Sequence, residues 1–204
     1  SYLPKCRKLN SSSMIISILI RSLYNREAML NSLLANLYTQ IVKGNHYFNV
    51  EVLVNRDNKE ITSGAKANEL LLAASGKYIV FIDDDDEVAD NYIELMLNAM
   101  KTDADCIGTQ GTYTINGGRP TRWYLSKDYQ DMDDYQGGEL VYLRRTNHIS
   151  PVKRELALLA MFPNISNGED KEYSRRLNPH LRTEEKITQP VYHYKYSTER
   201  KEYV

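Results

Sequence analysis

Four consecutive aspartates follow a short apolar segment near the middle of the chain, and no other feature limits fold and chemistry as much. Residues 76–87 read GKYIVFIDDDDE, and the β-branched and aromatic residues of 78–82 are typical of a buried strand. Adjacent carboxylates repel one another unless a cation or backbone donors neutralise them. The carboxyl ends of strands in α/β sheets commonly hold ligands, and oxygen ligands suit Mg²⁺ or Mn²⁺. The run therefore indicates a divalent metal site; an acidic turn that caps the next helix is the other interpretation.

The composition predicts one globular domain and excludes several classes of function. The chain has 204 residues, and its 26 Lys and Arg nearly cancel its 27 Asp and Glu, so nothing favours nucleic acid or an anionic membrane as a partner. Cys6 and Cys106 lack the spacing of a zinc site or a disulfide framework, which favours a reducing compartment. No apolar run approaches the ~20 residues of a membrane span. We therefore expect no membrane span in this chain and a cytoplasmic location.

Strands and helices alternate over the first hundred residues. Apolar runs predict strands at 15–20, 50–54, 78–82 and 106–115, with helices at 28–41, 64–75 and 89–100 between them. Asn25 is the expected cap of the first helix, Gly76 the expected end of the second, and 55–58 a polar loop. This alternation requires a mostly parallel sheet with right-handed crossovers.

The second half of the chain has a different pattern. Gly117 and Gly118 predict a hairpin turn, and the polar, aromatic segment 119–134 is interpreted as a flexible or acceptor-facing loop. Helices are expected at 151–161 and 168–177, and a late strand at 187–196. Residues 1–13 are polar and without periodicity, so we interpret them as a leader or expression scar.

The order of these segments resembles an inverting nucleotide-sugar glycosyltransferase of the family-2 type over nearly all of 14–196. The family signature A-x-G-x-Y-I-x-F-x-D-x-D-D falls on Ala74, Gly76, Tyr78, Ile79, Phe81, Asp83, Asp85 and Asp86. The resemblance implies an α/β fold: one glycosyltransferase-A domain at 14–204, with a central, mostly parallel mixed sheet flanked by helices. Residues 14–105 would form the nucleotide-binding half and 106–204 the acceptor-binding half. Size and composition are also similar to a glycosyltransferase module of a large algal virus, whose location would be the host cytoplasm.

The resemblance assigns the acidic run to the donor and its metal. Asp83 and Asp85 would be the metal-binding pair for Mn²⁺ or Mg²⁺, with Asp83 leaning toward the ribose and Asp85 binding the ion directly. Asp84 is placed beside the donor and Asp86 in a supporting role, because alternate side chains of a strand point to opposite faces. His193 is expected to complete the metal site, although a lone strand histidine is more often a packing residue. His148 is the weaker candidate.

Five further residues are assigned to the nucleotide. Arg21 and Ser22 end the first strand and would border the nucleotide, while Asp57 matches an acidic position that contacts the base. The segment around Asp57, VNRDNKE, departs from the usual V-D-D-G-S, so the base stays open between uracil and others. Lys66 and Asn68 would line the pocket; a solvated surface lysine is the alternative for Lys66. Asn55 or Arg56 could share the role of Asp57.

Gly168-Glu169-Asp170 matches the family's acidic motif at the start of a helix. The resemblance assigns Asp170 as the general base and Glu169 to the acceptor; an acidic pair that only complements the helix dipole is the alternative. Trp123, with Tyr124 and Tyr129, would stack on the acceptor, and a core position is equally compatible with a tryptophan.

Three functions are compatible with these residues. The main hypothesis is metal-dependent, inverting transfer of a hexosyl group from a nucleotide-sugar donor, expected to be UDP-linked, to a hydroxyl of a glycan or glycoprotein acceptor. A non-catalytic nucleotide-sugar-binding module is the second. A sugar-1-phosphate nucleotidyltransferase is the third, and it requires a Gly-rich loop after the first strand that residues 22–26 do not provide.

Overall fold

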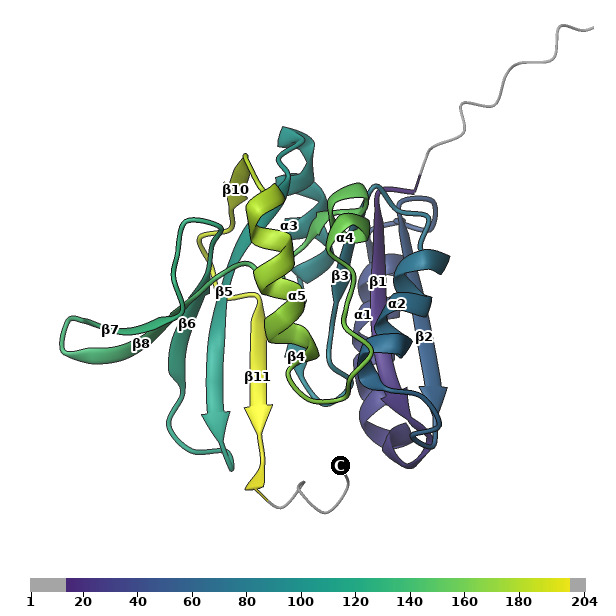
Figure 1. Cartoon of the computed structure of the whole chain (residues 1–204), viewed down its shortest axis with the longest axis horizontal. Helices are drawn as coiled ribbons and strands as arrows, with labels where there is room; N and C mark the ends of the chain where they lie inside the picture. Colours follow the sequence, from purple (N-terminus) through teal and green to yellow (C-terminus); the bar gives the residue numbers. More distant parts are fainter. Residues whose placement is uncertain (1–13, 199–204) are drawn as a thin grey trace, which may run out of the picture.

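A mixed sheet organises the chain, with helices on both of its faces (Figure 1). The computed structural model describes residues 14–198, and the expected leader at 1–13 lies outside them. The helices are α1 Glu27–Lys43, α2 Ser63–Ala73, α3 Tyr92–Ala99, α4 Arg154–Ala160 and α5 Glu169–Leu177, with 3₁₀ turns at Tyr24–Arg26, Met100–Thr102 and Asn178–His180. The strands are β1 Ile16–Leu23, β2 Val50–Asp57, β3 Tyr78–Phe81, β4 Glu87–Val88, β5 Cys106–Ile115, β6 Thr121–Leu125, β7 Met132–Gln136, β8 Glu139–Arg144, β9 Val152–Lys153, β10 Glu184–Lys186 and β11 Tyr192–Tyr196.

The strand order places the carboxyl ends of β1, β2 and β3 next to one another. Within residues 14–198 the main path of the eleven-stranded sheet is β2-β1-β3-β9-β5-β6-β8-β7, with β10 and β11 both parallel to β5. β1 pairs parallel with β2 and with β3, while the short β9 lies antiparallel between β3 and β5. The prediction of a central, mostly parallel mixed sheet is confirmed. This arrangement brings polar residues from three strand ends to one edge.

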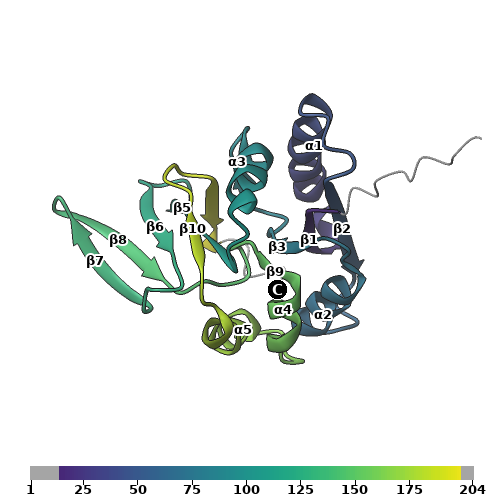
Figure 2. The ribbon, with the colours of Figure 1, turned by 90° about the horizontal axis from the view of Figure 1, so that it is seen from above.

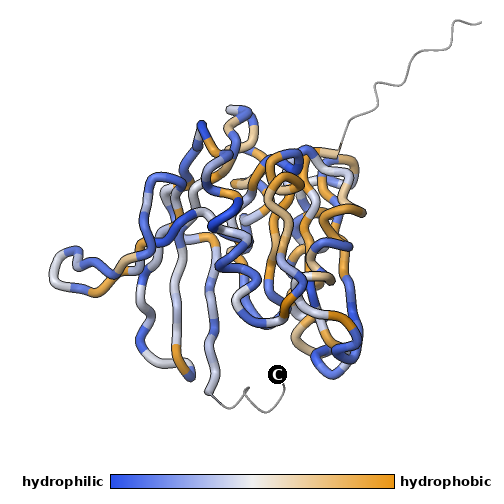
Figure 3. Tube along the Cα trace, in the orientation of Figure 1, coloured by the Kyte–Doolittle hydropathy of each residue, from blue (hydrophilic) through white to orange (hydrophobic). Residues whose placement is uncertain are grey.

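Two hydrophobic cores lie on the two faces of the sheet. Ile16, Ile18 and Ile20 of β1 pack toward α1 and α3, whereas Leu19 faces α2, α4 and α5, as the twofold alternation of a strand requires. Figure 2 shows these helix groups on opposite sides of the sheet. The hydropathic colouring in Figure 3 concentrates apolar residues around β1–β3, while the β7–β8 hairpin projects away from the helices. No helix between residues 14 and 198 has the length and apolarity of a membrane span.

Two boundaries differ from the prediction near the strand ends. Asn25 lies in the 3₁₀ turn before α1, so it does not cap that helix, which begins after Arg26 without a side-chain cap. β2 continues to Asp57, because its pairing with β1 extends to Leu23 opposite Asp57. Residues 55–57, expected in a loop, are therefore held in the sheet.

Gly76 has a different role from the one expected. It does not adopt the left-handed conformation of a helix-ending glycine, and α2 already ends at Ala73. A Cβ at position 76 would lie 2.5 Å from the backbone nitrogen of Ser17, so glycine is required because this segment approaches β1 closely.

Half of the expected loop at 119–134 is strand. β6 forms the predicted hairpin with β5 through Gly117 and Gly118, and it pairs on its other edge with β8. β7 then pairs with β8. The loop interpretation was wrong for the residues of β6 and β7, because the strand that pairs with both, β8, comes later in the chain.

Candidate functional site

Arg21 joins three carboxylates at the carboxyl end of β1. Its guanidinium lies 3.4 Å from Asp83, 3.1 Å from Glu169 and 3.2 Å from Asp170, and it also donates to the Ser63 hydroxyl at 2.9 Å. Burial alone would lower the pKa of Arg21, but the three carboxylates raise it by more than burial lowers it, so the side chain stays charged. The structure thus brings together four residues that the sequence motifs placed in the site.

Two aromatic rings hold the Arg21 guanidinium in place. Its carbon Cζ lies 5.6 Å from the ring centre of Phe81 and 5.8 Å from that of Phe162. These rings belong to the core between the sheet and α4, and they favour a cation over their faces. Arg21 is therefore a rigid cation between β3 and α5.

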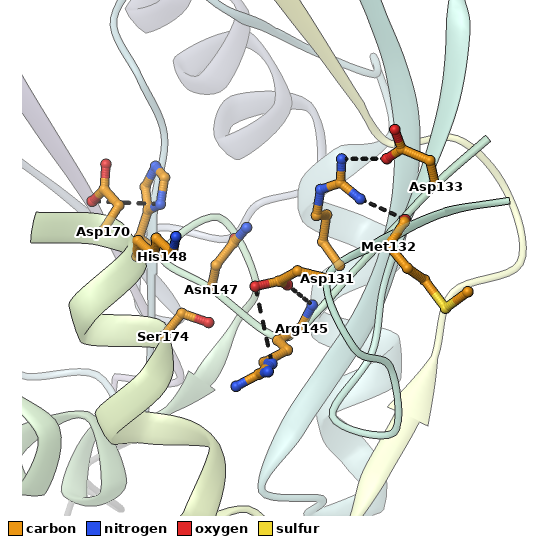
Figure 4. Close-up of a pocket in the computed structure, with 10 residues that line it drawn as sticks. Asp131, Met132, Asp133, Arg145, Asn147, His148, Asp170 and Ser174 are labelled. Carbon is orange, nitrogen blue, oxygen red and sulfur yellow. Dashed lines mark hydrogen bonds and ion pairs between the residues drawn. The ribbon is translucent and has the colours of Figure 1, made fainter. Parts of the chain in front are cut away.

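His148 connects the end of β3 to the start of α5. Its Nε2 lies 3.4 Å from Oδ2 of Asp83 and its Nδ1 lies 3.5 Å from Oδ1 of Asp170 (Figure 4). The His148 carbonyl accepts a hydrogen bond from the Phe81 amide at 2.9 Å, which ties the histidine to β3. From the sequence, His148 ranks below His193 as a site residue, and the structure reverses this order.

The charges of this cluster support one another. Burial lowers the pKa of His148, but the carboxylates of Asp170 and Asp83 outweigh it and raise the pKa above its ordinary value. Burial likewise raises the pKa of Asp83, and the charges of His148 and Arg21 outweigh it, so that the pKa lies well below its usual range. Asp83 is therefore ionised at neutral pH.

The raised pKa of His148 predicts a pH-dependent stability. A histidine with a folded pKa above its unfolded value of about 6.5 stabilises the fold fully below that pH and loses this contribution as pH rises through its folded pKa. We expect the free energy of unfolding to fall on His148→Gln substitution, and to fall more at about pH 6 than at about pH 9. Urea unfolding at both pH values measures this, with the exposed His180→Gln as control; a deficit that grows with pH would contradict it.

The four aspartates have different environments. Asp84 is buried and accepts hydrogen bonds from the Ser22 hydroxyl at 2.6 Å and from Arg26 at 2.7 Å, and burial raises its pKa to about 6. Asp85 is ion-paired with the other nitrogen of Arg26 at 3.1 Å. Ser22 and Asp84 thus bind each other, and Arg26, which no sequence motif indicated, lies between two of the aspartates.

Asp86 points into the sheet toward β11. It accepts hydrogen bonds from the Tyr192 hydroxyl at 2.7 Å and from the Lys195 amide at 2.9 Å, and burial raises its pKa to about 8. The supporting role expected for Asp86 fits this position. The alternative in which the run caps the following helix is wrong, because β4 intervenes and α3 begins only at Tyr92.

Asp57 and Lys66 form a buried ion pair where β1 and β2 end. The Lys66 ammonium contacts Oδ1 of Asp57 and donates to the Ser22 carbonyl at 2.9 Å, while Oδ2 of Asp57 accepts from the Ile61 amide at 3.1 Å. Burial would raise the pKa of Asp57, but the hydrogen bond from Lys66 outweighs it and lowers the pKa. Lys66 is only 4% exposed, so the alternative of a solvated surface lysine is wrong.

Replacing Lys66 with Met should lower the free energy of unfolding by about 3 kcal/mol, because the Asp57 carboxylate would stay buried without its cation. Chemical denaturation at neutral pH measures the loss. The double variant Lys66→Met/Asp57→Asn should recover part of it, since the unpaired charge is then removed as well. Equal losses in the single and double variants would contradict an ion-pair role.

The structure does not bring His193 to the acidic run. Its ring contacts the hydroxyls of Thr112 and Thr114 on β5, whereas its neighbour Tyr192 reaches Asp86. Adjacent residues of a strand point to opposite faces, so His193 lies on the face away from the carboxylates. The structure therefore does not place His193 with the carboxylates that the sequence assigned to the metal.

Asn68 and Glu169 are also placed differently from the prediction. The Asn68 amide donates to the Phe162 carbonyl at 2.9 Å and accepts from the Phe162 amide at 2.8 Å, so it fixes the end of α4 instead of lining a nucleotide pocket. Glu169 is buried against Arg21 and lines neither of the two cavities beside His148. For both residues the observed contacts indicate a structural role.

Two cavities flank His148. A charged cavity of about 650 Å³ adjoins Asp170 and includes Asp131, Arg145 and Lys171 on its wall (Figure 4). An apolar cavity of about 610 Å³ lies on the side of Asp83, and Trp123 forms part of its wall. Trp123 is nevertheless only 6% exposed and donates to the Thr112 carbonyl at 3.0 Å, so most of the ring belongs to the core.

Asp83 and Asp85 are the residues at the end of β3 that could hold a divalent cation, and each is ion-paired with an arginine in this structure. Within residues 14–198 no three Asp, Glu, His or Cys side chains converge on one metal position. Mg²⁺ is commonly bound by only one or two carboxylates together with substrate phosphates and waters. Asp83 and Asp85 supply such oxygens.

Comparisons with known proteins agree with this geometry. Residues 63–158, slightly under half of the chain, match the family described as Glycosyl transferase family 2, and this stretch contains the acidic run and His148. Solved structures of Staphylococcus aureus TarS residues 1–349 are similar. The complex with UDP-GlcNAc has a TM-score of 0.62 at 16% identity, covering 89% of this chain and 58% of that chain. The complex with UDP has a TM-score of 0.62 at 17% identity, and the match covers 91% of this chain and 62% of that chain.

These likenesses define the class of fold. The chain has the glycosyltransferase-A fold, and the family match supports a glycosyltransferase. It spans about three-fifths of the length of the TarS structures. No curated protein matches the chain.

Proposed function

We propose that this protein is a metal-dependent, inverting glycosyltransferase that moves a sugar from a UDP-linked donor to a hydroxyl of a glycan acceptor. The observation that carries the proposal is the cluster in which Arg21 and His148 hold Asp83, which follows β3, next to Asp170 of α5. A donor-side carboxylate and a candidate base thereby share one site. The solved TarS complex with UDP-GlcNAc has the same fold and supports a nucleotide-sugar donor.

The proposed reaction needs one base. Asp170 takes the proton of the acceptor hydroxyl. At the same time the hydroxyl oxygen bonds to the anomeric carbon of the donor sugar, and the bond from that carbon to the donor phosphate oxygen breaks. The electron pair leaves with the nucleoside diphosphate. A single displacement of this kind inverts the anomeric configuration. Asp170 lies in the first turn of α5, where the helix dipole favours a carboxylate.

The remaining roles follow from position. Asp83 and Asp85 would hold Mn²⁺ or Mg²⁺, which offsets the charge that develops on the leaving diphosphate. Arg21 and His148 orient Asp83 and Asp170 through the ion pairs described above. Asp57 at the end of β2 and Lys66 of α2 are proposed to lie on the nucleoside side.

Asp85→Ala tests the metal assignment. A ligand that binds only the folded state stabilises it by about 2.7 kcal/mol at a concentration about 100 times its Kd. We expect UDP-GlcNAc with Mn²⁺ to raise the melting temperature of the parent protein and not that of Asp85→Ala. The exposed Asp128→Ala serves as a matched control and should behave as the parent. Equal shifts in parent and Asp85→Ala would rule out the assignment.

A nucleotidyltransferase is not favoured by the structure. The connection between β1 and α1 is the 3₁₀ turn Tyr24–Arg26, which contains no glycine. Such enzymes need a chain of free backbone amides after the first strand to hold a triphosphate.

A further inference from the structure

Three tyrosine rings and Trp123 form the wall of the apolar cavity beside Asp83. Tyr113 of β5 stacks on Tyr194 of β11 with ring centres 5.2 Å apart and an angle of 18°, and meets Tyr142 of β8 edge-on at 6.0 Å. The cavity volume of about 610 Å³ is in the range of small-molecule sites. Three strands thus present a continuous aromatic surface next to the candidate site.

Polar groups stand at the rim of this aromatic surface. Arg144 is ion-paired with Asp133 at 2.8 Å and its guanidinium lies 4.9 Å from the centre of the Tyr142 ring, and Asn147 and His148 also line the cavity. A carboxylate, a guanidinium and an amide offer both acceptors and donors of hydrogen bonds. A sugar ring matches this combination, because it has an apolar C–H face and a polar edge of hydroxyls.

The cavity lies on the acceptor side of Asp83. Asp57 and Lys66 are at the β2–β1 end of the sheet, Asp83 follows β3, and the aromatic cavity lies over β5, β8 and β11. It shares Asp133, Arg144, Asn147 and His148 with the charged cavity that contains Asp170. A ring seated on the tyrosines therefore has its polar edge directed past His148 toward the candidate base.

We propose that this aromatic cavity binds a pyranose ring of the acceptor saccharide, with its reacting hydroxyl directed past His148 to Asp170. The inference rests on the proposed function, which it extends by assigning the acceptor class and its position. Tyr142 and Tyr194 provide the stacking surface. Asp133, Arg144 and Asn147 bind the hydroxyls.

Saturation-transfer NMR on the full chain without donor tests binding separately from catalysis. The probes are methyl β-D-glucopyranoside and methyl N-acetyl-β-D-glucosaminide, with glycerol as a polyol that lacks a ring. We expect transfer to ring C–H protons of at least one glycoside and not to glycerol. Tyr142→Ala and Tyr194→Ala should each abolish the signal, whereas Tyr142→Phe, which keeps the ring, should retain it. Tyr135→Ala, in the projecting hairpin outside the cavity, is the matched control.

The result also separates the acceptor ring from the sugar of the donor. The acceptor assignment predicts that UDP-GlcNAc affinity, measured by calorimetry with Mn²⁺, is the same in Tyr142→Ala as in the parent. A loss of about tenfold for UDP-GlcNAc, with UDP itself unchanged, would place the donor sugar in the cavity and overturn the proposal. Transfer signals that persist in both alanine variants, or no signal from either glycoside, would also overturn it. A glycoside signal together with absent binding of both UDP-GlcNAc and UDP would leave the cavity assignment as saccharide binding and refute the proposed UDP-sugar transferase function.

Discussion

Replacing Asp170 with Asn should reduce sugar transfer by about 10²–10⁴-fold while donor affinity stays at the parent value. Asparagine fills the same space at the start of α5 but accepts no proton from the acceptor hydroxyl. Donor binding depends on Asp83, Asp85 and the nucleoside side, none of which changes. Initial rates of UDP release in the presence of acceptor, together with calorimetry for the donor, measure the two quantities.

The control for this variant is Asp131→Asn. Asp131 lines the same charged cavity as Asp170 but pairs with Arg145 instead of the cluster at Arg21 (Figure 4). It should keep activity close to the parent. An Asp170→Asn enzyme that turns over at the parent rate would exclude Asp170 as the base. A parent protein that binds donor without turnover would instead indicate a binding module.

Replacing Arg21 with Met should lower the free energy of unfolding by about 3–5 kcal/mol at pH 7, because three carboxylates would face one another without their shared cation. Glu169 is buried and has Arg21 as its ion-pair partner, so leaving its charge unpaired should account for the largest part of this loss. Asp83 has a lowered pKa, so the stability it contributes is present above its unfolded pKa of about 3.9 and is lost as pH falls. The deficit of Arg21→Met should therefore shrink only as pH falls below about 3.9 toward the lower folded pKa of Asp83.

Two matched variants make this test specific. Arg21→Lys keeps the charge but not the planar fork, so it should recover only part of the stability. Arg175→Met on α5 removes an exposed ion pair with Glu172 and should cost at most about 1 kcal/mol. Urea unfolding at several pH values measures all three. If Arg21→Met cost no more than Arg175→Met, the three carboxylates would not depend on Arg21.

Most of the fold could be predicted from local sequence pattern. Hydrophobic alternation indicated β1, β3 and the full extent of β5, because these strands are buried along most of their length. Strand ends were harder, since β2 reaches Asp57 only through its pairing with β1. The β6 and β7 strands were missed because their order depends on β8, and no local pattern reveals a partner that distant.

Site residues that belong to a sequence motif could be predicted, whereas site residues that only tertiary contacts bring into place could not. Asp83 and Asp170 were found from their motifs, and the structure places both at Arg21. His148 and His193 look alike in sequence, and only the contact of the His148 segment with β3 and the register of β11 decide which one faces the carboxylates. Arg26 lies after a strand end, where a basic residue is common in many proteins. Nothing in the sequence therefore indicates that it pairs with Asp84 and Asp85.

The Tyr192 hydroxyl accepts a hydrogen bond from the Asp83 amide at 3.2 Å and donates one to Asp86 at 2.7 Å. One side chain from β11 therefore completes the turn that follows β3, although more than a hundred residues separate the two in the chain. On the ribosome, the acidic turn can reach its final shape only after β11 has emerged.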